Sequence, residues 1–291
     1  MTLTQYRPVR EAEMPEAVEI FLASVADMYR RHNIKQPAPP RPLVEKFYDH
    51  IRRTGIFHVA EVDGKITAIC HAIVRDHLWF LSGFWALPRL QGQGIGRTLL
   101  ERVWDEGSRA GAKIFFTWSS VDVRAMATYM KFGMLPGYQI LNFVGAFQSS
   151  SEALRGYETQ PLDIETAMNI DEQVRGTRRE CDHQFSIAEF KAEGRQLVRE
   201  ERAVGYYYFS NGTIGSAAWL KEEDAEALLE SACREVSKQA EQIRLMIPGV
   251  NHSAIRFALR AGLKLVSYSH LLTTEPFGQM EKYLPSGPSL F

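Results

Sequence analysis

Hydrophobic residues recur with helical and strand spacing along the first half of the chain. Apolar positions three and four apart predict helices, and shorter apolar runs bounded by Gly, Pro and Asp predict strands. Pro15 marks the start of the first helix and Gly133 the end of the last. The predicted helices cover residues 17–28, 43–53, 123–132 and a segment around Leu99 that ends near Gly107; the predicted strands cover residues 6–10, 56–62, 66–74, 80–86, 113–118 and 138–147.

The second half of the chain repeats this pattern, with every matched position shifted by the same amount. Helix, strand and helix keep one offset without a gap, and chance rarely preserves the intervening loop lengths as well. The paired positions are Leu99 with Leu228, Leu100 with Leu229, Ile114 with Ile243, Ala125 with Ala254, and Gly133 with Gly262.

Two domains of one fold follow from this repeat. The predicted domains are residues 1–148 and 157–291, joined by the serine-rich linker 149–156. The expected fold class is α/β (α+β), with each domain a mixed, mostly antiparallel sheet flanked by helices.

Composition narrows the range of partners and compartments. With 45% hydrophobic and 24% charged residues and a net charge of −1, the composition implies neither a nucleic-acid nor a membrane-surface partner. The three cysteines lack metal-ligand spacing, so we expect reduced thiols and no metal. No apolar signal segment precedes Arg10, and the apolar stretch 78–87 is too short to span a bilayer. These features predict a cytoplasmic protein and leave homo-oligomer formation open.

A glycine-rich segment stands directly before the Leu99 helix. Residues 91–96 read Gln, Gly, Gln, Gly, Ile, Gly. Glycines at a helix start let backbone N–H groups approach a pyrophosphate, which the positive end of the helix dipole also favours. A P-loop needs Lys and Ser or Thr after the last glycine, and a dinucleotide fingerprint needs a different spacing after the first strand of a βαβ unit. A purely structural turn is the alternative.

The pattern Gln-x-x-Gly-x-Gly, with Pro88 three residues before it, resembles the acyl-CoA signature of the GNAT superfamily of N-acyltransferases. The resemblance implies that the loop holds the pyrophosphate of acetyl-CoA and that the preceding strand pairs through its backbone with the pantetheine arm. It also implies that no metal takes part. The implied cofactor-binding residues are Phe84, Trp85, Ala86, Gly92, Gln93, Gly94, Ile95, Gly96, Arg97 and Asp122.

A second motif lies on the predicted helix 123–132, which follows the Leu99 helix and the next strand. Asp122, Ala125, Tyr129 and Gly133 fall where the family has Asn-x-x-Ala-x-x-x-Tyr-x-x-x-Gly. The resemblance makes Tyr129 the catalytic acid that protonates the departing thiolate, a role that a phenol can fill. A packing role is the alternative. Asp122 replaces the commoner Asn, and we interpret it as the N-cap of its helix.

The general base is missing from its usual places. Family members often carry a Glu on the strand before the loop or on the next strand, but residues 80–87 contain no carboxylate and Thr117 occupies the second place. His71, Asp76 and His77 are the remaining candidates, acting directly or through water. Ordinary strand and turn roles are the alternative for each.

The second copy is expected to have lost the site. At the offset that relates the two copies, Gly94 corresponds to Glu223 and Tyr129 to Ala258, so carboxylates replace the phosphate cradle and no phenol remains. The polar segment 175–183 is interpreted as a solvated helix face, with substrate contact as the alternative.

The resemblance therefore predicts an acyl-CoA-dependent N-acyltransferase. The expected reaction moves acetyl from acetyl-CoA to a primary amine of a small molecule by direct attack within a ternary complex. The proline-rich loop 37–42 is expected to cover the acceptor. Two alternatives stay open: a non-catalytic acyl-CoA sensor or interaction module, and acetylation of a protein amine.

Overall fold

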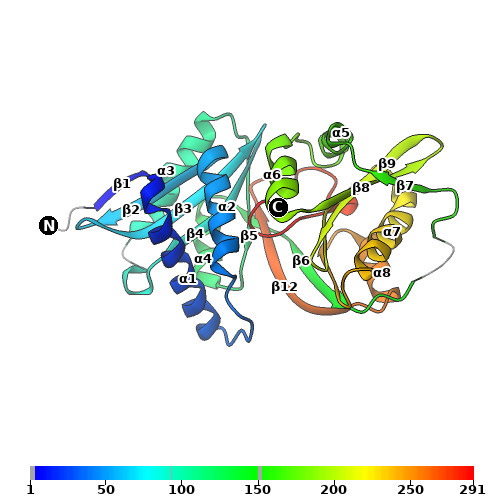
Figure 1. The fold of residues 1–291 in the computed structure, drawn as a ribbon. Helices are drawn as coiled ribbons and strands as arrows, with labels where there is room; N and C mark the ends of the chain where they lie inside the picture. Colours follow the sequence, from blue (N-terminus) through cyan, green and yellow to red (C-terminus); the bar gives the residue numbers. More distant parts are fainter. Residues whose placement is uncertain (1–3, 93, 150–152) are drawn as a thin grey trace. The chain divides into compact units, whose positions relative to one another are not determined.

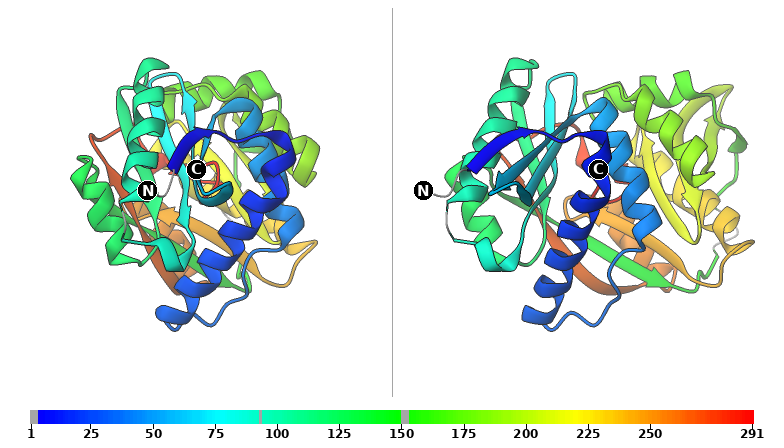
Figure 2. Two further views of the ribbon diagram at one scale, coloured as in Figure 1. Left: turned by 90° about the vertical axis from the view of Figure 1, so that its left-hand side faces the viewer. Right: turned by 60° about the vertical axis from the view of Figure 1, so that its left-hand side comes forward.

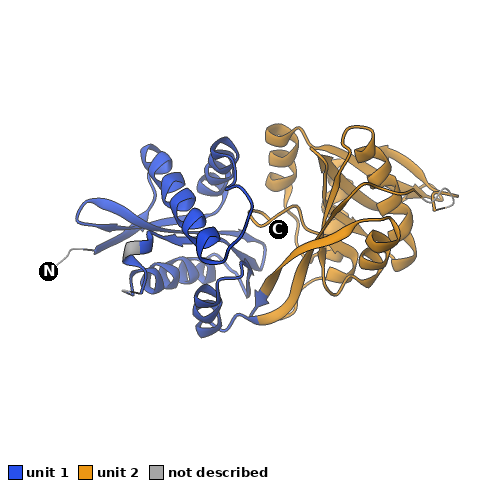
Figure 3. Ribbon diagram, turned by 90° about the horizontal axis from the view of Figure 1, so that it is seen from below, with its two compact units in different colours: residues 1–135, 272–274 blue, residues 136–271, 275–291 orange. Residues whose placement is uncertain are grey.

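A computed structural model describes residues 4–92, 94–149 and 153–291, and it divides into two compact units (Figure 3). Unit 1 comprises Met1–Leu135 and Leu272–Thr274, and unit 2 comprises Pro136–Leu271 and Glu275–Phe291. No helix among the described residues is both long and apolar enough to cross a membrane.

Unit 1 contains a mixed sheet whose first four strands are antiparallel neighbours, whereas the fourth and fifth run parallel. Helices α1 and α2 cover one face of this sheet, and α3 and α4 cover the other (Figures 1 and 2). The strands are β1 (Thr4–Pro8), β2 (Ile56–Val62), β3 (Lys65–Arg75), β4 (Leu78–Ala86) and β5 (Ile114–Ser119), and the helices are η1 (Glu11–Glu13), α1 (Met14–Arg31), α2 (Arg41–Thr54), η2 (Pro88–Leu90), α3 (Ile95–Arg109) and α4 (Val123–Lys131).

The predicted elements of unit 1 are confirmed in type and order. The sheet is mixed and mostly antiparallel, as expected, and its α3 face encloses an apolar core with Leu99, Leu100 and Val103 fully buried. Burial of such side chains is the main source of stability for an α/β layer. The first strand begins and ends two residues before its predicted bounds, because its pairing with β2 starts at Thr4.

Unit 2 repeats the layered arrangement, with strand order β12-β6-β11-β10-β9-β8-β7 and β13 paired with β10. Its strands are β6 (Leu135–Gly145), β7 (Glu158–Pro161), β8 (Glu193–Arg199), β9 (Arg202–Ser210), β10 (Thr213–Trp219), β11 (Ile243–Pro248), β12 (Lys264–Thr273) and β13 (Tyr283–Leu284), and its helices are α5 (Ile164–Val174), α6 (Glu180–Phe190), η3 (Glu222–Asp224), α7 (Ala225–Ser237), α8 (His252–Arg260) and η4 (Met280–Lys282).

The constant offset between the two halves reappears in the bounds of the elements. The offset that pairs Ile114 with Ile243 relates both ends of β5 to both ends of β11, and both ends of α4 to both ends of α8. Both α4 and α8 start behind a side-chain cap, supplied by Asp122 and Asn251 respectively. The repeat seen in the sequence is therefore a repeat of structure.

The division into compact units differs from the predicted domain boundary at residue 148. Strand β6 pairs with β11 along its length, from Ile140 opposite Pro248 to Gly145 opposite Ile243, and so belongs to unit 2. In return, the end of β12 belongs to unit 1, where Thr274 N donates to Phe115 O at 2.9 Å.

Each unit thus takes a closing strand segment from the other half of the sequence. Strand pairing depends on which sheet edge a segment reaches, and local sequence pattern does not encode that choice. Within the predicted linker 149–156, residues 150–152 lie outside the described part of the chain.

Candidate functional site

Strands β4 and β5 separate halfway along β4. They pair in parallel from Leu78 opposite Ile114 to Leu81 opposite Thr117, and β4 then continues to Ala86 without β5. Its second half still pairs with β3 on the other side. The edge that faces away from β3 is therefore available for a ligand to pair with as an added strand.

The direction of each backbone group on this edge follows from the ladder with β3. Leu87 N donates to Thr67 O at 2.9 Å, so the N–H and C=O groups of alternate residues point the same way as those of Leu87. Trp85 therefore directs its backbone to β3, whereas Phe84 and Ala86 direct theirs to the edge that β5 has left. Of the three strand residues predicted to pair with pantetheine, two face the right side.

The carbonyl group of Ala86 is already engaged. It accepts hydrogen bonds from Ser24 Oγ at 3.1 Å and from Gln91 Nε2 at 3.0 Å. Gln91, the first residue of the glycine motif, thus ties the loop to the end of β4. The backbone of Phe84 and the N–H of Ala86 are the groups that face the opening.

The three glycines of the loop serve two different purposes. Gly92 and Gly94 have φ angles of +84° and +82°, in the left-handed region that glycine adopts without strain. Gly96 instead permits close packing, because a Cβ atom there would stand 2.8 Å from Cζ of Phe84. Gln93, predicted to bind the cofactor, lies outside the described residues.

Helix α3 begins at this loop with uncapped backbone donors. Gly94 is its N-cap and offers no side chain, and the N–H of Thr98 bonds back to Gly94 O at 3.3 Å. The N–H groups of Ile95, Gly96 and Arg97 precede this bond, so they have no partner within the helix. Together with the helix dipole they favour an anion at this position.

A hollow of about 150 Å³ adjoins the first turn of α3. Arg97 and Glu101 of α3 line it together with Thr128, Lys131 and Phe132 at the end of α4. The Arg97 side chain is exposed and forms an ion pair with Glu101 at 2.9 Å. Two cations therefore stand beside the predicted pyrophosphate loop.

Tyr129 lies on α4 beside Phe84, with 6.3 Å between the ring centroids. It is 7% exposed and belongs to the same apolar cluster as Cys70. Burial, followed by the neighbouring Cys70 and Asp122, raises the pKa of Tyr129 above its ordinary value of 10.0. Because its pKa is raised, the phenol stays protonated at neutral pH.

Asp122 is confirmed as the N-cap of α4. Its Oδ1 accepts from Arg124 N at 3.0 Å, and its Oδ2 accepts from Arg31 Nη2 of α1 at 2.8 Å. Burial would raise the pKa of this carboxyl, but the hydrogen bonds from Arg124 and Arg31 outweigh it and lower the pKa to about 2. The carboxylate is thus committed to the cap and to the link between α1 and α4.

Two of the three candidate bases lie far from the opening. Asp76 and His77 form the turn before β4, whereas the opening begins beyond Leu81 and ends at Ala86. At about 3.3 Å per residue, the two ends of β4 are separated by roughly 26 Å. Thr117 lies on β5, and its hydroxyl donates to Leu81 O of β4 at 3.1 Å.

His71 is the candidate that the fold places opposite the half of β4 that β5 has left. It sits opposite Gly83 on β4, and a Cβ atom at Gly83 would stand 2.3 Å from its Nε2. Its ring packs against Tyr48 and Phe57 at centroid distances of 4.7 Å each. Burial lowers its pKa to about 3, so the imidazole is neutral at physiological pH.

The corresponding connection in unit 2 differs in length as well as in charge. Eight residues, Leu87–Gly94, join β4 to α3, whereas five, Leu220–Asp224, join β10 to α7. Glu223 and Asp224 are held by Arg199 at 2.7 and 3.0 Å. Unit 2 therefore has a shorter, acidic connection in place of the glycine loop.

The sequence of the polar segment 175–183 indicated a solvated helix face, and this prediction is wrong for Arg179 and His183. Arg179 and His183 are 3% and 1% exposed, and both contact the buried carboxylate of Asp171, at 2.5 and 3.1 Å. Burial opposes the ionised carboxylate, but Arg179 and His183 still lower the pKa of Asp171. The cluster is closed to solvent and joins α5 to α6 within unit 2.

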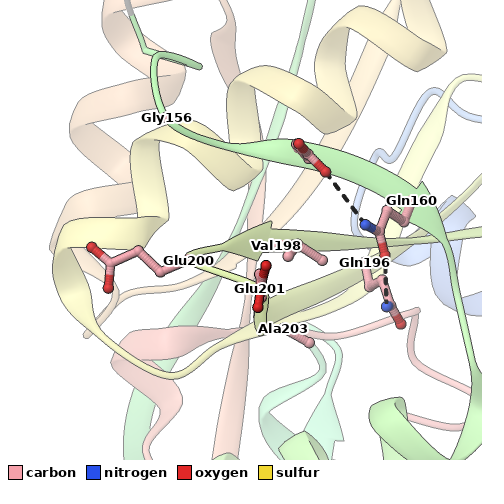
Figure 4. A pocket seen from close by; sticks show the side chains of 8 residues that line it. Gly156, Gln160, Gln196, Val198, Glu200, Glu201 and Ala203 are labelled. Atoms are coloured by element: carbon pink, nitrogen blue, oxygen red, sulfur yellow. Dashed lines mark hydrogen bonds between the residues drawn. The ribbon is translucent and has the colours of Figure 1, made fainter.

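A larger hollow of about 420 Å³ lies along strands β7 to β9 of unit 2 (Figure 4). Glu158, Gln160 and Gln196 form a chain of long hydrogen bonds of 3.5 Å, and the side chain of Glu200 is directed away from it. The polar groups do not converge on one point, and this hollow lacks the donors that the phosphate loop of unit 1 offers.

Comparison with known proteins agrees with this geometry. Residues 21–134 match the model of the acetyltransferase (GNAT) family. No curated protein matches the chain.

Solved structures resemble the whole chain. A candidate acetyltransferase from Pyrococcus horikoshii superposes with a TM-score of 0.76 at 16% identity, covering 99% of this chain and 96% of that one. A GCN5-related N-acetyltransferase from Sphaerobacter thermophilus gives 0.64 at 16% identity, with coverage of 96% and 98%. A tandem GNAT protein from the clavulanic acid biosynthesis pathway gives 0.58 at 14% identity, with coverage of 94% and 99%. The fold is therefore that of tandem GNAT proteins.

Proposed function

We propose that unit 1 is an acetyl-CoA-dependent N-acetyltransferase that acts on a primary amine of a small molecule. One observation carries the proposal: the free edge of β4 at Phe84 leads directly into a glycine loop and the uncapped start of α3. A ligand with an amide-containing arm that ends in a pyrophosphate matches this succession of groups. Coenzyme A has that construction.

The charges around the loop support the assignment. The pyrophosphate would accept hydrogen bonds from the N–H groups of Ile95 and Gly96, where the helix dipole is favourable. Arg97 and Lys131, which line the adjacent hollow, would pair with the further phosphate on the ribose of CoA.

The acid chemistry falls to Tyr129. The amine attacks the thioester carbonyl carbon, a C–N bond forms and the C–S bond breaks, and the sulfur leaves with the electron pair. The buried phenol of Tyr129 is protonated at neutral pH and can deliver its proton to this thiolate. Direct attack needs no covalent acyl-enzyme, since both substrates are bound side by side.

The test combines calorimetry with a transfer assay. We expect one acetyl-CoA per chain, because unit 2 lacks the glycine loop. Thiol release is then followed with a panel of benzylamine, tyramine, putrescine and glucosamine, against hydrolysis without amine.

Each outcome of the test separates the candidate functions. Amine-dependent release supports the proposal. Tight binding without release from any amine would favour a sensor, and transfer only to lysines of added protein would favour a protein acetyltransferase. Two bound CoA molecules per chain would contradict a non-catalytic unit 2.

A further inference from the structure

His71 is buried in the sheet although its polar atoms have no partner in the described part of the chain. It is 2% exposed, yet neither ring nitrogen has a hydrogen-bond partner among the described residues. The hydroxyl of Tyr48, whose ring contacts it, is also buried and unpaired. Buried polar atoms without partners are costly, so an apolar side chain would pack here at lower cost.

The position of Gly83 gives the unpaired nitrogen a direction. Gly83 stands on the half of β4 that β5 has left, one residue before Phe84, whose backbone faces the opening. Because Gly83 has no side chain, the imidazole edge with Nε2 occupies the space where a β4 side chain would begin. A histidine of β3 thereby occupies the place of a missing side chain on the half of β4 that β5 has left.

We infer that His71 accepts the proton of the acceptor amine through Nε2, an inference that rests on the acetyl transfer proposed above. After attack the new C–N bond leaves a positive charge on the nitrogen, which then loses its proton to Nε2. The electron pair of the broken C–S bond stays on sulfur, which takes its proton from Tyr129. His71 returns its proton to solvent when the product leaves.

The surroundings of His71 keep its imidazole neutral. Phe57 of β2 and Tyr48 of α2 pack on its ring, and Gly83 of β4 lies at its edge. Tyr48 is the titratable group among them, and burial raises the pKa of its phenol so that it stays neutral. Burial is also the cause of the lowered pKa of His71, and no charged group contributes. The base is therefore deprotonated across the working pH range.

The decisive variant is His71→Phe, assayed with the panel amine of highest turnover. We expect kcat to fall at least 100-fold, as for loss of a general base, with the Kd for CoA changed less than twofold. The melting temperature should not fall, because Phe fills the aromatic cluster without unpaired nitrogens. His58→Gln is the matched control: His58 is also a buried strand histidine, but it contacts Glu106 at 2.7 Å, and its loss should leave kcat unchanged.

A second variant and a pH profile keep the inference open to refutation. Gly83→Ala forces a Cβ atom onto the His71 ring and should reproduce the loss of kcat. For the unaltered protein, log kcat/KM should rise with pH as the ammonium form of the substrate loses its proton, without an inflection near 6.5, the ordinary pKa of histidine.

The experiments distinguish a failure of the His71 inference from a failure of the proposed function. If the unaltered protein transfers acetyl but His71→Phe keeps more than half of kcat, His71 is a packing residue and only this inference falls. A His71→Phe variant that melts earlier and loses CoA would overturn it in the same way. If no amine releases CoA from the unaltered protein, the proposed function falls and this inference falls with it.

Discussion

At the scale of single residues, the three glycines of the loop have different structural roles. Gly92 and Gly94 supply left-handed backbone, whereas Gly96 makes room for Phe84. The sequence motif contains all three glycines, but it does not show which of them needs a positive φ and which needs space for a neighbouring side chain. The contact with Phe84 joins two elements and appears only in the folded chain.

Tyr129→Phe tests the acid at this scale. Removing the hydroxyl should lower kcat about 100-fold, because the thiolate then leaves without a proton donor. The Kd for CoA should stay within twofold, measured by calorimetry. Tyr6→Phe removes a hydroxyl from a residue of β1 and serves as the control. A Tyr129→Phe variant with unchanged turnover would assign the proton donation to another group.

Asp122 gives a pH-dependent stability. Its pKa in the folded chain is about 2, below the ordinary 3.8, so its ionised form stabilises the fold above about pH 4 and this contribution is lost as the pH falls towards 2. Asp122→Asn keeps the cap but loses the ion pair with Arg31, and should cost about 2 kcal/mol at pH 7.

Chemical denaturation at pH 7 and pH 2.5 measures this difference. The gap between the Asp122→Asn variant and the unaltered protein should shrink at the lower pH. Asp163→Asn, at the exposed N-cap of α5, is the control and should change stability little at either pH. An equal loss at both values would show that the ion pair is not responsible.

At the scale of elements, the end of β4 and the start of α3 form one continuous functional unit. The strand offers the backbone of Phe84, Gln91 fastens the loop to Ala86, and the helix presents free N–H groups. The sequence predicted the strand, the loop and the helix in this order. It did not predict that β5 leaves β4 after Leu81, which is what frees the edge.

Two glycines that flank α3 allow the effect of backbone strain to be measured separately from the effect on ligand binding. Gly94 begins the helix and Gly111 follows its end; both have positive φ, and neither would place a Cβ atom within 4 Å of another group. Alanine at either should cost about 1–2 kcal/mol in unfolding free energy.

Only Gly94→Ala should also weaken CoA binding, by tenfold or more, since it reshapes the phosphate loop. Thermal unfolding and calorimetry on the two variants provide the comparison. Equal CoA affinities for Gly94→Ala and Gly111→Ala would remove the loop from the binding site.

At the scale of the whole molecule, the two copies of the repeat are not two independently closed domains. Unit 1 includes Leu272–Thr274, and β6 belongs to unit 2. A fragment ending at residue 148 would therefore leave the β5 edge without Thr274 and β6 without β11.

We expect fragment 1–148 to lack a cooperative thermal transition by circular dichroism and to bind CoA at least tenfold more weakly than the full chain. Co-expression with fragment 149–291 should restore both properties, because the exchanged strands are then present. An isolated fragment 1–148 that melts cooperatively and binds CoA normally would contradict this dependence.

The sequence by itself determined the elements, their repeat at one constant offset, and the resemblance to the GNAT family, because hydrophobic periodicity and the glycine and tyrosine motifs are local in the chain. The tertiary structure alone decided which strand closes each unit, which backbone groups face the opening, and that Arg179 and His183 are buried against Asp171. It also brought His71 to Gly83 and left Asp76 at the far end of β4. These properties depend on strand register and packing between distant segments, for which a local pattern carries no signal.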